Sequence, residues 1–203
     1  MARQSGKRQT RKTYVVLGDG QTEQYYLKHL RMLKGYKYSI RPSLFSSITI
    51  ETAGSIIDEY LSGGCDQIIY FTDYDTIVNQ NKNAEFEKLK GKYAETDEVL
   101  ICETMPSIEF WFLLHFLKTT REFSNASEVE TLLIKYLSGY SKGEAYLKNS
   151  KWVETLCANG KLSQAINNST SILAEKEKQK ASHFPYSKAH IAIEYFEKQK
   201  KNP

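Results

Sequence analysis

The segment Gln67-Ile-Ile-Tyr-Phe-Thr-Asp-Tyr-Asp75 places an apolar run directly before two carboxylates. A short run of β-branched and aromatic residues that ends in polar residues is typical of a buried strand. Similar runs lie at 13–17, 38–42 and 98–102, the second weaker than the others. Between the runs, apolar residues recur at helical spacing, at 21–33, 52–61 and 84–93. Strands that alternate with helices in this way predict a parallel sheet flanked by helices.

The chain changes character after Cys102. No convincing strand is found beyond it, and helices are expected at 106–117, 128–137, 151–158, 161–178 and 187–200. The first of these is apolar on nearly every face, which is typical of a buried helix. We therefore divide the chain into a basic N-terminal arm at 1–12, an α/β domain at 13–103, and a helical region at 104–203 that packs on it.

Composition indicates an ordinary globular chain. Of its 203 residues, 40% are hydrophobic and 26% are charged, which argues against a disordered or fibrous protein. The longest apolar run is interrupted by Glu109 and His115. We therefore expect no transmembrane helix and no association with a membrane. The N-terminus also lacks the apolar stretch of a signal peptide. Three widely spaced cysteines without a CxxC pair fit neither a disulfide framework nor a zinc site, and favour the cytoplasm.

The net charge of +4 is unevenly distributed along the chain. Residues 1–12 hold five bases and no acid, so the remainder is slightly acidic. Such an arm is either a disordered leader or a segment that contacts phosphates. If the body binds nucleic acid, it needs the arm, local lysines, a metal ion or a partner to do so.

Two acidic turns follow strands of the predicted sheet. Asp73 and Asp75 end the segment quoted above, and Asp19 and Glu23 lie in the turn Gly18-Asp19-Gly20-Gln21-Thr22-Glu23. We expect both turns at the same edge of the sheet, because functional groups gather at the carboxyl ends of parallel strands. Alternate residues of an extended segment point the same way, which would let Asp73 and Asp75 face one cation. Mg²⁺ and similar cations prefer oxygen ligands and support phosphoryl chemistry.

Each turn also has an ordinary structural interpretation. D-x-D pairs are common in loops, and Asp19 or Thr22 could cap the first helix. The first turn is not a P-loop, because no GK[ST] sequence follows it. A phosphatase of the haloacid dehalogenase type is a further alternative. Its motif, D-x-D-x-[TV], follows the first strand of that family, whereas here the fifth position is Ile77 and the strand comes late.

Taken together, these residues resemble the Toprim domain and, more closely, the RloB-like family. Toprim domains carry an acidic residue after the first strand and a D-x-D after the third. RloB-like members have a basic start, a turn like EGxxTE, here with Asp19 where Glu is more usual, and a segment like NPxFExWLLLHF. The last is matched by Met105-Pro106-Ser107-Ile108-Glu109-Phe110-Trp111-Phe112-Leu113-Leu114-His115-Phe116, with Met105 in place of Asn. The resemblance is good from residue 12 to about 118.

The resemblance implies a Toprim-like fold of about four parallel strands with a C-terminal helical extension. It further implies a Mg²⁺- or Mn²⁺-dependent nuclease of prokaryotic antiviral defence by abortive infection, which acts on DNA or RNA beside an ATPase partner. The catalytic and metal-binding residues would be Asp19, Glu23, Asp73 and Asp75, supported by Glu109 and His115. The alternative is a non-catalytic binding or regulatory subunit of an ATPase-containing complex. The choice of nucleic acid, the number of metal ions and homo-oligomer formation are left open.

Glu109 and His115 are about 240° apart around a helix, so they are not expected to act as a close pair. Burying Glu109 in so apolar a segment costs free energy unless it is paired. Both a structural hydrogen bond and contact with the active centre therefore remain open for Glu109. We expect His115 to be a core histidine that shares a helix face with Trp111. Tyrosines near lysines, such as Tyr140 near Lys142, could stack bases and hold phosphates, but we expect these tyrosines to serve packing.

Overall fold

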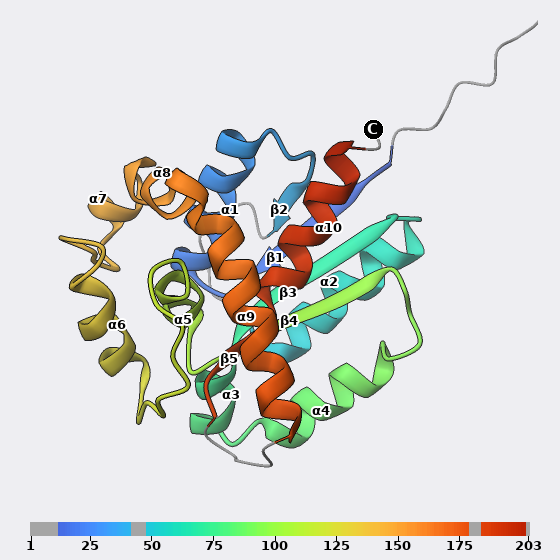
Figure 1. Ribbon diagram of the computed structural model, residues 1–203. Coiled ribbons are helices and arrows are strands. Elements are labelled where there is room, and N and C mark those ends of the chain that lie inside the picture. The colour runs from blue at the N-terminus through green and yellow to red at the C-terminus, as the bar shows by residue number, and fades with distance from the viewer. Residues whose placement is uncertain (1–11, 42–47, 179–183, 202–203) are drawn as a thin grey trace, which may run out of the picture.

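A five-stranded sheet with the strand order β2-β1-β3-β4-β5 forms the centre of the computed structural model (Figure 1). The structure describes residues 12–41, 48–178 and 184–201, so nearly all of the predicted basic arm lies outside the described residues. As predicted, the first four strands run parallel to one another. They are β1 (Tyr14–Gly18), β2 (Ser39–Arg41), β3 (Gln67–Asp73) and β4 (Val99–Met105).

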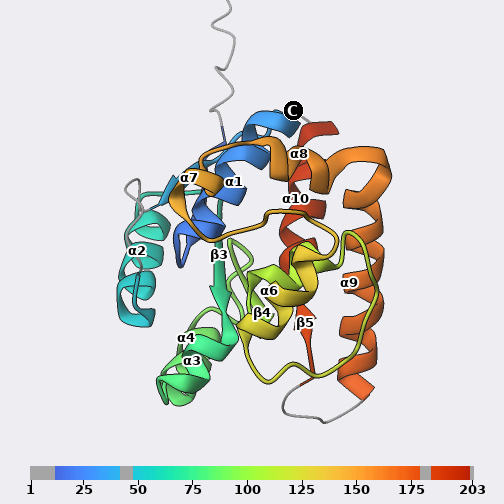
Figure 2. The ribbon, with the colours of Figure 1, turned by 90° about the vertical axis from the view of Figure 1, so that its left-hand side faces the viewer.

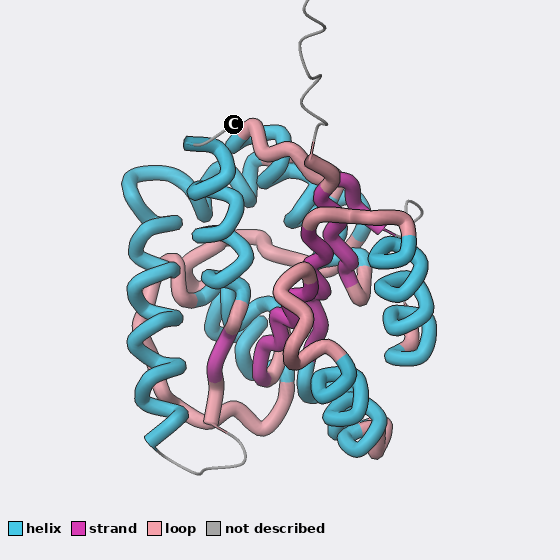
Figure 3. The backbone as a smooth tube through the Cα atoms, turned by 90° about the vertical axis from the view of Figure 1, so that its right-hand side faces the viewer, coloured by secondary structure: helices cyan, strands magenta, loops and turns pink. Residues whose placement is uncertain are grey.

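Helices cover both faces of this sheet. The first half of the chain forms α1 (Gln21–Lys34), α2 (Ile50–Ser62), α3 (Tyr74–Asn79) and α4 (Asn83–Lys92). The second half forms α5 (Ile108–Leu113), α6 (Ala126–Ile134), α7 (Glu144–Leu147), α8 (Lys151–Cys157), a 3₁₀ turn (Ala158–Gly160), α9 (Lys161–Lys178) and α10 (Ala189–Lys201). Figure 2 shows α2, α3 and α4 on one side of the strands and α9 and α10 on the other, and Figure 3 shows the same two layers from the opposite side.

Alternation along the strands accounts for the two layers. In β1, Val15 and Leu17 pack in a cluster with residues of α2 and α4, whereas Val16 packs in a larger cluster with α1, α5 and α10. Successive side chains of a strand point to opposite faces, so one continuous apolar run supplies both cores. This explains why the parallel strands are visible in the sequence as unbroken apolar runs.

The prediction of a purely helical second half is wrong at one place. β5 (Tyr186–Ser187) pairs antiparallel with the edge of β4, and the Thr104 and Ser187 hydroxyls form a 2.9 Å hydrogen bond beside it. A two-residue strand is too short to show alternation, and its second residue, Ser187, falls within the segment predicted as the last helix. The boundary drawn at residue 103 stays a prediction, although β4 extends past it to Met105.

Helix lengths differ from the predictions mainly around α5. The apolar segment 106–117 forms a helix only over Ile108–Leu113, after which the backbone closes tighter bonds such as His115 N–H to the Phe112 carbonyl. The short helices α3 and α7 were not predicted. Among the described residues, no helix is long and apolar enough to cross a membrane.

Candidate functional site

A cavity of about 370 Å³ opens at the carboxyl ends of β1 and β3. Four carboxylates from separate parts of the chain line it, namely Asp19, Glu23, Asp73 and Glu109. Lys142 is the only basic side chain among the described residues that line the cavity. We call this group of five side chains the acid pocket. The sheet edge therefore brings the two predicted acidic turns together, as the parallel topology requires.

The glycine-rich turn positions Asp19 and Glu23 without using either Asp19 or Thr22 as a helix cap. Gly20 is the N-cap of α1, and no side chain among the described residues caps this end. Asp19 Oδ2 instead accepts a 2.6 Å hydrogen bond from the Thr72 hydroxyl on β3. A Cβ atom on Gly20 would lie 3.0 Å from Glu23 Oε2. A side chain at this position would therefore crowd the Glu23 carboxylate, which folds back against the turn.

The two aspartates of the D-x-D do not both lie in an extended segment, contrary to the expectation. β3 ends at Asp73 and α3 begins at Tyr74, so Asp75 lies in a helix and not in the extended segment that the expectation assumed. Asp73 lines the pocket, and its Oδ1 accepts a 2.7 Å hydrogen bond from the Ile108 backbone N–H. Asp75 is not among the described residues that line the cavity.

Glu109 combines both roles that the sequence left open. It lines the pocket, it is fully buried, and each of its oxygens has a partner. Oε1 accepts from the Tyr140 hydroxyl at 2.7 Å and lies 3.0 Å from Lys142 Nζ, and Oε2 accepts from the Ser107 hydroxyl at 2.6 Å. The tyrosines near Lys142 were expected to serve packing, and the place of Lys142 in the pocket was missed because no local pattern marks a lysine in the loop between α6 and α7.

His115 lies in the core away from the pocket. Its ring is 4.9 Å from that of Trp111, and its Nδ1 is 3.0 Å from the Trp111 carbonyl oxygen, which can only accept, so Nδ1 carries the proton. Nε2 has no hydrogen-bond partner within the described part of the chain. Burial lowers the pKa of His115 to about 4. The structure thus places His115 as the neutral core histidine that we expected, sharing a face with Trp111.

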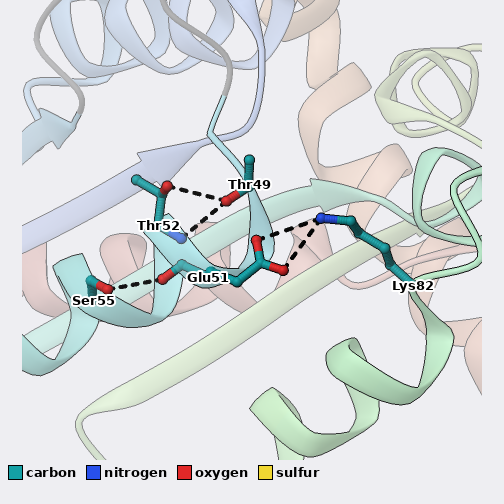
Figure 4. A network of polar contacts seen from close by, with 5 residues as sticks. All are labelled: Thr49, Glu51, Thr52, Ser55 and Lys82. Carbon is teal, nitrogen blue, oxygen red and sulfur yellow. Dashed lines mark hydrogen bonds and ion pairs between the residues drawn. The ribbon is translucent and has the colours of Figure 1, made fainter.

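The far wall of the pocket is the N-terminus of α2, where Thr49 and Ile50 line the cavity. Figure 4 shows how this end is fixed. The Thr49 hydroxyl caps the helix by accepting from the Thr52 backbone N–H at 3.2 Å, and Glu51 pairs with Lys82, with a 3.3 Å separation between Oε1 and Nζ. The ion pair is exposed and contributes little to stability, but it ties α2 to the segment between α3 and α4.

Burial raises the pKa of the pocket carboxylates, and repulsion between neighbouring carboxylates adds to it at Glu23 and Asp73. Burial, followed by repulsion from Glu109 and Asp19, raises the pKa of Glu23 to about 7. Burial and repulsion from Glu23 and Glu109 also raise the pKa of Asp73, and burial raises that of Asp19. Burial alone would lower the pKa of Lys142, but the neighbouring Glu109 and Asp73 outweigh it, and the net pKa is raised. The pocket therefore holds more acid than its single lysine neutralises.

The donor set fits a hard divalent cation. Within the described residues, no three His, Cys, Asp or Glu side chains are grouped closely enough to hold a metal ion by themselves. Mg²⁺ does not need such a cage, because it commonly uses one or two carboxylates and completes its shell with water and substrate phosphate. Asp19, Glu23 and Asp73 offer carboxylate oxygens of this kind, and their raised pKa values show that added positive charge would stabilise the pocket.

Comparison with known proteins gives one match. The family model described as RloB-like protein matches residues 14–196, from the first strand into the last helix. The match thus includes the helical region, which the sequence motifs linked to this family only by general character. No curated protein and no solved structure matches the chain.

Proposed function

This chain belongs to the RloB-like family, and we propose that it is a Toprim-type nuclease that uses Mg²⁺ or Mn²⁺ to hydrolyse phosphodiester bonds of DNA or RNA in prokaryotic antiviral defence. The observation that carries the proposal is the convergence of Asp19, Glu23 and Asp73 in one cavity at the carboxyl edge of a parallel sheet. Acidic residues at this place in the fold are what metal-assisted phosphoryl chemistry requires.

Each pocket carboxylate would have its own role in the proposed reaction. A bound Mg²⁺ ion would polarise a phosphate oxygen and make its water more acidic. Asp19 and Asp73 would hold the ion, because each is oriented by a hydrogen bond to one carboxylate oxygen, from Thr72 and from the Ile108 N–H. Glu23, with its pKa raised to about 7, is suited to take a proton from the attacking water near neutral pH. Asp75 is outside the described lining of the cavity, but its charge interacts with those of Asp73 and Lys142, and its predicted part in metal binding stays a prediction.

The charge of the pocket explains why the proposed enzyme would need help to bind its substrate. Four carboxylates and one lysine repel a polyanion until a metal ion is bound. A basic segment or a partner protein would supply the remaining attraction, and an ATPase of the same defence complex is the partner that we propose. Binding of nucleic acid should accordingly depend on a divalent cation and weaken with salt.

The proposal is tested by comparing Asp73→Asn with Asp75→Asn. Asparagine keeps an oxygen that accepts from the Ile108 N–H, so the fold should survive while the metal loses a charged ligand. We expect cleavage of labelled DNA or RNA oligonucleotides by Asp73→Asn to fall by about 10²-fold or more, and that by Asp75→Asn by less than about tenfold. Circular dichroism and urea unfolding would check that both variants are folded. Undiminished cleavage by Asp73→Asn would contradict the proposal.

The alternative function is a non-catalytic subunit that binds a partner. One observation favours it: Met32 and Leu33 on α1 are 72% and 46% exposed, and they line a second cavity of about 200 Å³ together with Val153 of α8. Exposed apolar side chains beside a groove are typical of an interaction site. Calorimetric titration with Mg²⁺ and Mn²⁺ separates the two functions, because the absence of binding at millimolar concentration would favour the subunit.

A further inference from the structure

Three lysines from separate elements gather around Glu103, at the β4 edge of the sheet. Lys90 belongs to α4, Lys176 belongs to α9, and Lys188 follows β5 directly. The Lys188 ammonium lies 2.9 Å and the Lys90 ammonium 3.9 Å from Glu103 Oε1. The Lys176 ammonium lies 3.1 Å from the centre of the Tyr186 ring, whose hydroxyl donates to the same oxygen. We call this group of residues the basic region.

Lys176 carries the positive charge that the basic region does not neutralise. Glu103 is shared by Lys90 and Lys188, and Glu87 pairs with Lys90. In the described part of the chain, Lys176 has no ion-pair partner. Burial lowers its pKa to about 8, and repulsion from Lys188 and Lys90 adds to this effect, although Glu103 opposes it. A bound anion would offset the repulsion and favour the charged form of the lysine.

Exposed lysines elsewhere are arranged differently. Lys92 follows Lys90 by two positions in α4, and its ammonium pairs with the Asp58 carboxylate of α2. One lysine matched with one carboxylate is an ordinary surface feature that leaves no net charge for a ligand. In the basic region three lysines meet two carboxylates. All three can be reached from solvent, because the Lys90 and Lys188 side chains are 28% and 30% exposed and Lys176 is only partly buried.

The basic region lies one strand away from the acid pocket, at the same edge of the sheet. Glu103 of β4 is the register partner of Thr72 of β3, and the Thr72 hydroxyl donates to Asp19 of the acid pocket. Neighbouring strands are about 4.8 Å apart. A nucleic acid carries a phosphate about every 3.4 Å along each strand of a duplex. A chain with one phosphate at the acid pocket therefore brings further phosphates within reach of the lysines.

We propose that the basic region, with Lys176 as its central contact, binds a backbone phosphate of the nucleic acid beside the phosphate that is cleaved. The inference rests on the nucleic-acid substrate of the proposed function and adds to it a second contact site. Lysine binds phosphate as a compact point charge and does not read bases. The site should therefore hold DNA and RNA of any sequence, and it supplies part of the attraction that the acid pocket lacks.

Binding of a fluorescently labelled oligonucleotide to the full chain tests the proposal. Ca²⁺ replaces Mg²⁺ so that the probe stays intact, and anisotropy is followed over a series of salt concentrations. We expect Lys176→Gln to weaken binding by about tenfold, and to lower the slope of log affinity against log salt by about one. Lys176→Arg keeps the charge and should stay within about threefold of wild type. A probe with neutral methylphosphonate linkages should bind weakly and equally to all of these proteins.

Lys92→Gln is the matched control, because it removes the same charge from α4 outside the basic region. It should leave the affinity within about twofold of wild type and the salt slope unchanged. Urea unfolding checks that every variant is folded. If Lys176→Gln does not fold, Lys90→Gln takes its place, and it should also weaken binding and lower the salt slope.

The outcomes separate this inference from the proposed function. Equal affinity and salt slope in wild type and Lys176→Gln would overturn the inference, and so would an equal loss of the charged and the neutral probe. No binding of the charged probe by wild type would overturn it as well. Cleavage of the same oligonucleotide by wild type with Mg²⁺ or Mn²⁺ is measured separately. Binding that depends on Lys176 without any cleavage would support the phosphate site and count against the nuclease.

Discussion

Two buried glutamates, Glu103 at the end of β4 and Glu109 in α5, have similar hydrogen-bond partners. The charged groups that surround them differ in sign. Each accepts a hydrogen bond from a tyrosine hydroxyl, Tyr186 at 3.3 Å for Glu103 and Tyr140 at 2.7 Å for Glu109. Each also pairs with a lysine, and the Lys188 Nζ lies 2.9 Å from Glu103 Oε1. Around Glu109 the other nearby charges are carboxylates, whereas around Glu103 they are lysines and Glu87, which pairs with Lys90 at 2.6 Å.

The Glu103 region is the basic counterpart of the acid pocket. Lys90 lies 3.9 Å from Glu103 Oε1, and the Lys176 ammonium lies 3.1 Å from the centre of the Tyr186 ring. Burial lowers the pKa of Lys176 to about 8. Glu103 is thus held by one tyrosine hydroxyl and neighbouring lysines, and one of its oxygens, Oε2, has no partner among the described residues. Glu109 has a partner on each oxygen, with two buried hydroxyls besides its lysine.

Removing the two glutamates should give the largest difference between the regions. We expect Glu109→Ala to lower the free energy of unfolding by about 2–4 kcal/mol, because the Tyr140 and Ser107 hydroxyls lose their acceptor in the core. The loss of the repulsion between Glu109 and Glu23 is favourable and is already included in this range. Glu103→Ala should lower it by about 1–2 kcal/mol, since Lys90 and Lys188 are 28% and 30% exposed and can be hydrated. Urea denaturation measures both, and equal losses would contradict the comparison.

The acid pocket should also give the protein a pH dependence between about pH 4.5 and 7, below the pH range in which Lys176 of the basic region titrates. The folded pKa of Glu23 is about 7, above its ordinary 4.5, so the folded state binds more protons than the unfolded state between these values. The free energy of unfolding therefore falls as the pH rises from about 4.5 to 7, and it stays low above that.

Glu23→Gln removes this contribution and isolates it from the other titrating groups. Because the raised pKa penalises the charged form, we expect the variant to be more stable than wild type by about 1–3 kcal/mol at pH 8 and equally stable near pH 4. Thermal or urea unfolding of both proteins without metal, over this pH range, measures the difference. A constant difference between the two proteins at every pH would show that Glu23 does not titrate as described.

The smallest effects should come from one glycine in each region. Gly20→Ala places a Cβ atom 3.0 Å from Glu23 Oε2. This oxygen is the flexible end of a side chain, so the free energy of unfolding should change by less than about 1 kcal/mol. Mn²⁺ affinity should nevertheless fall by about tenfold, because the Glu23 carboxylate is displaced. Gly91, beside Lys90 in α4, is exposed, and no described atom lies within 4 Å of an added Cβ.

Gly91→Ala is the matched control for Gly20→Ala. It should raise the free energy of unfolding by about 0.5–1 kcal/mol through the better helix propensity of alanine, and it should leave Mn²⁺ affinity unchanged. Calorimetry on the two variants side by side checks this. If both alanines alter metal affinity alike, the close approach at Gly20 is not what positions Glu23.

How far the sequence predicts this molecule depends on the range of the interactions concerned. The four parallel strands were predicted within a few residues, because a strand buried on both faces is an unbroken apolar run. The acidic turns could be placed at one sheet edge because each follows directly after one of these parallel strands. The direction of Asp75 could not be predicted, since it depends on α3 starting directly after β3, and six residues of helix leave no clear periodicity.

Side-chain partners that are far apart in the sequence were the other part of the structure that could not be predicted. Tyr140 and Glu109 are 31 positions apart, and nothing near Lys142 indicates that its loop reaches the pocket. Glu109 was recognised only as a costly buried charge that requires a partner, and the identity of that partner came from the tertiary structure. β5 was missed because two residues carry no strand pattern.

The short strand β5 has a consequence for how the chain is made. It pairs with β4 across 83 positions of sequence, as the Thr104 and Ser187 hydroxyl pair shows. During synthesis β4 emerges long before its neighbour, so one of its edges stays open while most of the helical region is still being translated. An open edge is where a strand pairs with another chain. The newly made protein therefore depends on its final helices, or on a chaperone, to protect β4 until Tyr186 and Ser187 arrive.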